Sequence, residues 1–118
     1  MKNRKTIVFG KNEFEFFFGL SFLGEFLDEQ NITLEQIDEK LNRNPFKFIP
    51  TLMHESYLHN LKRRGQNNGL GYYDFVDVLE DNGGFGSVQV QEFIKAFTES
   101  LVKDVPESEE NAETSKKK

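Results

Sequence analysis

The feature that most constrains the fold is a change of hydrophobic period within residues 13–29, EFEFFFGLSFLGEFLDE, which contain six of the chain's thirteen phenylalanines. Up to Phe18, aromatic residues alternate with glutamates, a pattern typical of a strand with one buried face. From Leu20 onward the apolar residues recur at helical spacing, and Gly19 lies between the two patterns. The segment therefore predicts a strand that ends at a glycine and is followed at once by a helix.

This pattern assigns most of the large side chains to a core, on one face of the strand and one side of the helix: Phe14, Phe16, Phe18, Leu20, Leu23 and Leu27. That core does not require three of the aromatic residues. Phe17 lies on the glutamate face of the strand, and Phe22 and Phe26 lie at the rim of a helical apolar arc of about 160°. We predict that Phe17, Phe22 and Phe26 contact a partner. The alternative is that they pack under the later helices, because aromatic residues are frequent in cores as well as in interfaces.

The beginning of the chain predicts a β-hairpin over residues 5–18, with GKN as its turn. After the helix at 20–30, Thr33 and Gln36 form a capping-box pattern for a helix at 33–43, and Asn44-Pro45 ends it. We expect a third helix with Pro50 in its first turn, which ends before Gly65.

Two more helices are expected at 72–79 and 88–103, separated by the glycine-rich DNGGFG, with Ser87 as the cap of the last one. The fold class is therefore α+β, an N-terminal β-hairpin followed by about five short α-helices in one mostly helical domain over residues 1–103. Residues 104–118 are polar and predict a disordered tail.

Composition restricts the functional classes. The net charge of −5 argues against a protein that coats nucleic acid, and the absence of cysteine excludes disulfides, thiolate metal sites and cysteine nucleophiles. No stretch reaches the roughly 18 uninterrupted apolar residues of a membrane span, and the first ten residues lack the apolar run of a signal peptide. We therefore expect no membrane contact, and the lack of cysteine fits a reducing cytoplasm.

Two segments resemble metal sites. HESYLH places His54 and His59 five residues apart, which on a helix puts them on different faces, so we expect two partly exposed histidines and no zinc. DNGGFGSVQVQE has the spacing of a calcium loop from Asp81 to Glu92. It has Gly83 and Phe85 where oxygen ligands are needed, so we expect no metal and no cofactor.

No pattern of catalytic residues predicts an enzyme, since nucleophile, phosphate-cradling and dinucleotide motifs are missing. The basic cluster LKRRG (61–65) is explained by the preference for cations at a helix C-terminus, so no nucleic-acid partner is expected.

The order of elements resembles a family, that of the tail assembly chaperones of long-tailed bacteriophages, especially those of Gram-positive hosts. A second strand that ends in Phe-Gly and a helix that reads Leu-x-Phe-Leu carry the resemblance, which extends over about residues 5–103. The matching residues are Phe16, Phe18, Gly19, Leu20, Phe22, Leu23 and Leu27.

The resemblance implies a non-enzymatic protein of the host bacterial cytoplasm that binds the tape measure protein and keeps it soluble. Such chaperones give way as tail tube subunits polymerise, and they are absent from the finished particle. A ribosomal frameshift near the end of the gene often makes a longer form that recruits tube protein, and the final lysines of SKKK are compatible with a slippery site. Self-association also remains open.

Two other classes are kept as alternatives. One is a small regulatory or DNA-binding phage protein with a helix-turn-helix at 50–64 and 72–80, although GQNNGLG is longer than the usual turn of that motif. The other is a metal-responsive binding module that uses the calcium-like loop at 81–92.

Overall fold

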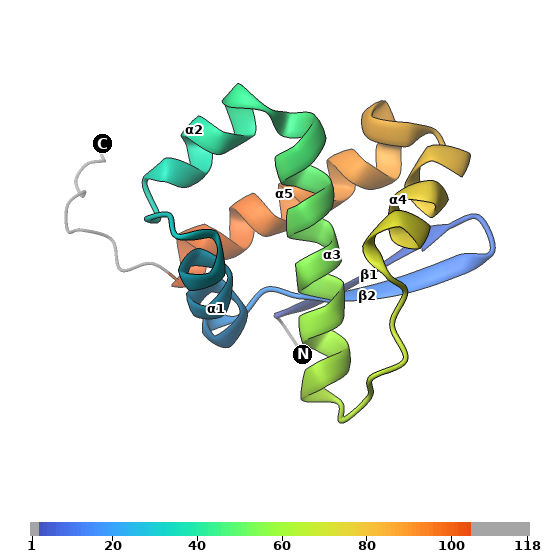
Figure 1. Ribbon diagram of the computed structural model, residues 1–118, viewed down its shortest axis with the longest axis horizontal. Coiled ribbons are helices and arrows are strands. Elements are labelled where there is room, and N and C mark those ends of the chain that lie inside the picture. The colour runs from blue at the N-terminus through green and yellow to red at the C-terminus, as the bar shows by residue number, and fades with distance from the viewer. Residues whose placement is uncertain (1–2, 105–118) are drawn as a thin grey trace.

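The chain forms a two-stranded antiparallel hairpin followed by five α-helices, as the computed structural model shows for residues 3–104 (Figure 1). The predicted α+β class is confirmed. The elements are β1 (Arg4–Phe9), β2 (Asn12–Phe17), α1 (Leu20–Gln30), α2 (Gln36–Arg43), α3 (Pro45–Arg63), α4 (Tyr72–Asp81), the 3₁₀ turn η1 (Gly84–Gly86) and α5 (Val88–Asp104). The expected disordered tail and its terminal lysines lie almost wholly outside the described residues, except that Asp104 is the last residue of α5.

The hairpin has a two-residue turn at Gly10 and Lys11, and its register sets Ile7 opposite Phe14. Gly10 has a φ of 65°, a left-handed conformation that favours glycine, and a Cβ there would lie 2.5 Å from the side-chain oxygen of Asn82, so a larger residue would also have to displace that side chain. Beyond the strand, the Phe18 amide donates to the Asn3 carbonyl at 2.7 Å, which continues the pairing as far as the hinge at Gly19.

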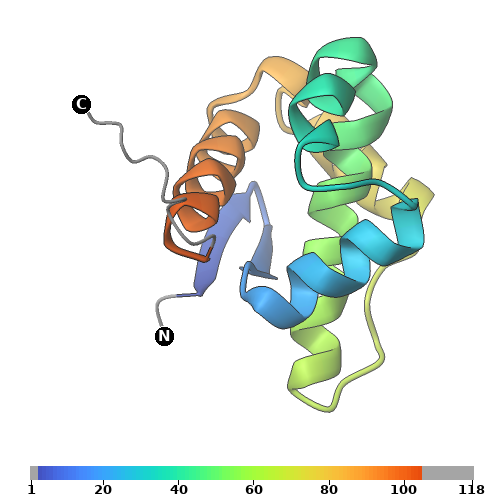
Figure 2. The same ribbon diagram turned by 90° about the vertical axis from the view of Figure 1, so that its left-hand side faces the viewer.

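The hairpin is the middle layer of the molecule, with α5 on one side and α3 on the other (Figure 2). Phe16 and Phe18 contact the ring of Phe93 on α5, with ring centroids 4.9 and 5.4 Å apart. Phe14 lies against Tyr57 of α3 and Phe75 of α4 at 4.9 and 5.0 Å. The alternation of side chains along β2 therefore places Phe14 and Phe16, with Phe18 just beyond the strand, on one face, and this face packs in a core rich in aromatic rings.

The helix α1 buries a narrower sector than its sequence predicts. Phe22, Leu23 and Phe26 are buried, Leu27 is half-buried, and Leu20 is 66% exposed, so the assignment of Leu20 to the core is wrong. An arc of about 160° is wider than one neighbouring helix can cover. The helix α3 covers the Phe22 side of that arc, and Leu20, at the first helical position, is left facing outward.

Two helix starts differ from the prediction. The helix α3 begins at Pro45, so the same residue that ends α2 occupies the favoured first position of α3, and Pro50 lies inside the helix. The helix α2 begins only at Gln36. Half of the predicted capping box is nevertheless formed, since the Thr33 amide donates to Gln36 Oε1 at 2.8 Å.

The last helix begins where the sequence predicts. The Val90 amide donates to Ser87 Oγ at 3.1 Å, which confirms Ser87 as the cap of α5.

Within residues 3–104, no helix combines the length and the apolar character that crossing a membrane requires.

Candidate functional site

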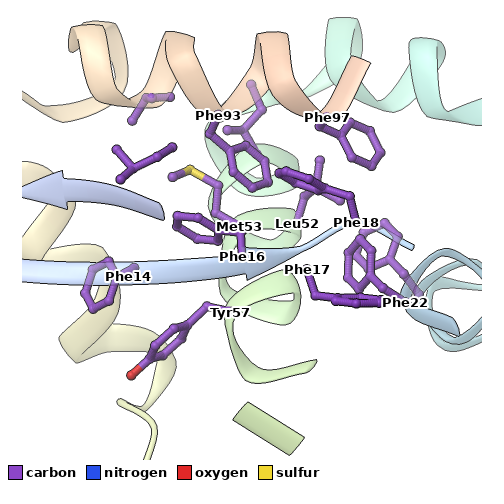
Figure 3. Packing of buried hydrophobic residues seen from close by; sticks show 14 of the residues in the cluster. Phe14, Phe16, Phe17, Phe18, Phe22, Leu52, Met53, Tyr57, Phe93 and Phe97 are labelled. Atoms are coloured by element: carbon purple, nitrogen blue, oxygen red, sulfur yellow. The ribbon is translucent and has the colours of Figure 1, made fainter. Parts of the chain in front are cut away.

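The three residues predicted to contact a partner are all buried. Phe17, Phe22 and Phe26 expose 3%, 2% and 1% of their surface, so their assignment to the molecular surface is wrong and the alternative, packing under a later helix, is what the structure shows. Phe17 points away from α5, toward the side of β2 that the second half of α3 covers (Figure 3). Both Phe17 and Phe22 contact the imidazole of His59, and Phe26 lies against Phe48.

A buried asparagine joins the outer face of the hairpin to α3. Asn60, 1% exposed, accepts from Arg4 Nε at 2.6 Å and donates to Glu15 Oε1 at 3.0 Å. Arg64 binds the same carboxylate through two nitrogens, at 2.8 and 3.1 Å, and this contact is the main reason that the pKa of Glu15 is lowered. The glutamate face of the strand is thus partly an internal interface, which its alternating pattern does not reveal.

A second polar cluster joins α1 to α3. Ser21 Oγ lies 2.9 Å from His59 Nε2, His59 Nδ1 lies 3.5 Å from Glu25 Oε1, and Arg63 donates to Ser21 Oγ at 3.1 Å. Burial lowers the pKa of His59, against the opposing effect of Glu25, so the imidazole is neutral at pH 7. A neutral ring with its Nδ1–H toward the carboxylate accepts the serine proton at Nε2.

Serine, histidine and carboxylate in this order are also the parts of a hydrolase triad. A triad needs room for a substrate beside the serine. The hollow that His59 lines is about 100 Å³, and Ser21 is not among the residues that line it. The contacts of the cluster clamp α1 to α3.

The histidines and the basic cluster have internal roles that their sequence patterns did not predict. His54 and His59 are 6% and 7% exposed, so the expectation of partly exposed side chains is wrong. The helix does direct them to different neighbours, and His54 Nε2 donates to the Leu70 carbonyl at 2.8 Å. Lys62 pairs with Glu25 at 3.3 Å, and the guanidinium of Arg63 lies 4.4 Å from the ring centre of Phe17.

The calcium-like loop is folded into the 3₁₀ turn η1 and the start of α5. Glu92, at the twelfth position of that loop, pairs with Lys5 at 3.1 Å. No cluster of three or more His, Asp or Glu side chains suited to a metal ion occurs in the part of the chain that the structure describes.

The exposed aromatic surface lies elsewhere, where α3, α4 and η1 meet. Phe46 is 71% exposed, and its ring centre lies 4.7 Å from that of half-buried Phe85. Together with Pro50 and Val76 these rings line a hollow of about 160 Å³, which we call the apolar groove. Its floor is formed by core residues such as Met53. Sequence reasoning missed the groove because Phe46 was expected in the connection between two helices.

The chain was compared with known proteins. It matches no protein-family model, no curated protein sequence and no solved structure.

Proposed function

We propose that the protein is a tail assembly chaperone of long-tailed bacteriophages, a non-enzymatic protein of the host bacterial cytoplasm that binds the tape measure protein and keeps it soluble while the tail tube polymerises. The resemblance at the Phe-Gly hinge and the following helix supports this function. The observation that carries it is the apolar groove, because an exposed aromatic ring, Phe46, beside the half-buried ring of Phe85 over a hollow is a typical docking feature for an apolar side chain.

The groove fits the capture of a helical client. A helix presents apolar side chains every three or four residues, and a groove of this kind accepts one or two of them. Full burial of a ring such as Phe46 contributes about 1.5–3 kcal/mol. A single contact of this energy binds the client weakly. Many copies of the chaperone bound along one client would hold it effectively, and each copy would dissociate readily when tube subunits compete for the client.

The proposed contact residues are therefore Phe46 and Phe85, in place of Phe17, Phe22 and Phe26. Tube protein would be recruited mainly through a frameshifted longer form. No specific observation favours the two alternative functions. For a DNA-binding protein, the basic residues Lys62, Arg63 and Arg64 already have partners within the fold. For a metal-responsive module, the last ligand position of the calcium-like loop, Glu92, is paired with Lys5.

The proposal is tested by co-purification of the protein with the tape measure protein of the same phage. We expect Phe46→Ser to remain folded, because the side chain is mostly exposed, and to reduce capture of the client on the order of tenfold. The matched control is Leu20→Ser, which removes a similarly exposed apolar side chain on α1, an element that does not line the groove and that lies apart from α4 (Figure 1). Equal capture by the parent protein and by Phe46→Ser would contradict the groove, and no capture by the parent would contradict the function.

A further inference from the structure

A second and larger hollow lies beside the apolar groove. It occupies about 660 Å³ between the end of α1, the helix α2 and the first half of α3. Three cations line it, namely Lys40, Arg43 and Lys47, and Phe48 and Tyr72 contribute aromatic walls. We call it the basic cleft.

The cations of the cleft are largely available to a ligand. Arg43 pairs with Glu39 one turn earlier at 3.6 Å, an exposed contact of small energy. Lys47 Nζ lies 5.2 Å from the ring centre of Tyr72, and neither Lys47 nor Lys40 forms an ion pair with any residue that the structure describes. The cleft thus presents three positive charges in a protein whose net charge is −5.

One carboxylate, that of Glu55, lines the cleft together with the three cations. Burial raises the pKa of Glu55, and repulsion from Glu29 raises it further. The three cations that line the cleft thus outnumber its one carboxylate, and an external carboxylate would add to the counter-charge.

The cleft and the apolar groove share the same elements. Phe46 lines the groove, and the next residue, Lys47, lines the cleft. On α4, Tyr72 lines the cleft, and Val76, one turn later, lines the groove. A segment that crosses the start of α3 therefore meets an apolar surface and a cationic surface in succession.

We propose that the basic cleft binds carboxylate side chains of the same client segment whose apolar side chains enter the apolar groove, so that the chaperone selects an acidic amphipathic segment. This inference rests on the proposed function and defines the chemistry of the client. An extended polyanion such as nucleic acid would be repelled by the net charge of −5, whereas a few carboxylates match the few cations of the cleft.

The test uses two synthetic amphipathic peptides of about 20 residues, long enough to be helical. Both carry the same leucine stripe, and they differ only in that one has glutamates beside the stripe where the other has glutamines. Affinity is measured by fluorescence anisotropy with the full chain. We expect the glutamate peptide to bind on the order of tenfold more tightly at low salt, as two or three exposed ion pairs would provide, and to lose this advantage at high salt.

The variant Lys40→Gln/Lys47→Gln, which leaves only Arg43 of the three cations, should lose most of the preference for the glutamate peptide. The control Lys11→Gln/Lys95→Gln, which changes exposed lysines on the hairpin turn and on α5, should keep the preference. Circular dichroism verifies that both variants are folded.

The inference is overturned if the parent protein binds the two peptides equally or binds neither, or if both double variants keep the preference. Binding of the whole tape measure protein separates the two proposals. If the client binds while the peptides are not distinguished, the acidic selectivity fails and the proposed function stands. If the client does not bind at all, the proposed function fails.

Discussion

The burial of Phe17 depends on single side chains that are distant in the sequence. Its ring contacts His59 and two guanidinium groups, those of Arg4 at 5.1 Å and Arg63 at 4.4 Å. A strand pattern reports which residues share a face, but it does not report what covers that face. The sequence predicts Phe17 at the surface because it shares its strand face with the acidic Glu13 and Glu15, although Glu15 itself binds Asn60 of α3 and Arg64, the residue that follows this helix.

Asn60→Ala should lower the free energy of unfolding by about 2–3 kcal/mol, because it removes the two hydrogen bonds that link Arg4 and Glu15 through a buried amide. Chemical denaturation monitored by circular dichroism measures the change. The matched control is Asn42→Ala on the exposed side of α2, which should change stability by less than about 0.5 kcal/mol. Equal effects of the two substitutions would show that the amide does not join the hairpin to α3.

At the scale of elements, the sequence predicts the segments with strong periodicity. The hairpin, the hinge at Gly19 and the last helix follow from local pattern and capping alone, and they agree with the structure within a few residues. The start of α3 was missed because Pro45 and Pro50 both satisfy the preference for proline in a first turn. Local sequence rules cannot choose between a helix that begins at Pro45 and one that begins at Pro50. The burial of Phe48 and Ile49 in the core favours the start at Pro45.

The sequence predicts that an aromatic binding surface exists, but it does not predict which residues form that surface. A density of thirteen phenylalanines indicates that some aromatic surface is available, but the choice among them depends on which helices cover which rings. Phe46 is exposed because it lies at the second position of α3, while Phe48, two residues later and on another side of the helix, is buried. The cleft combines residues of α1, α2, α3 and α4, so no local motif marks it.

The helix α5 offers a test of an element boundary. Ser87→Ala removes the side-chain acceptor of the Val90 amide and should lower the free energy of unfolding by about 1 kcal/mol. Ser87→Asp should retain stability, because aspartate caps a helix equally well and its charge is favourable at an N-terminus. Thermal unfolding of the three proteins provides the comparison, and equal loss in both variants would argue against a capping role.

At the scale of the whole molecule, α3 has two halves with different roles. Its second half is tied to the hairpin and to α1 by Ser56, His59, Asn60 and the three cations that follow. Its first half lines both the apolar groove and the basic cleft. One helix thus holds the layers together at one end and presents the proposed binding surface at the other, so variants of the surface can be tested without loss of the fold.

The clamp at His59 should make the stability of the whole molecule depend on pH. Its pKa in the folded protein is lowered, mainly by burial, so the unfolded chain takes up a proton first as the pH falls through the ordinary value of 6.5. The free energy of unfolding should therefore be highest above about pH 7.5 and should decrease on acidification, by at most about 1.4 kcal/mol for each pH unit. The groups that face the ring are Glu25, which opposes this shift, and Lys62 and Arg63, which add to it.

The pH effect can be separated from that of the carboxylates. Glu15 has a lowered pKa, and its contribution is lost only as the pH falls below the ordinary carboxyl value of 4.5, so the histidine effect is measured between pH 7.5 and 5.5. The pKa of Glu55 is raised, so its effect on stability has the opposite sign, but this carboxyl is present in both proteins compared and cancels in their difference. Urea unfolding of the parent protein and of His59→Gln across this range is the measurement. We expect His59→Gln to be less stable at pH 7.5 and to lose less stability on acidification than the parent. The same pH slope in both proteins would mean that a group other than His59 controls the acid sensitivity of the fold.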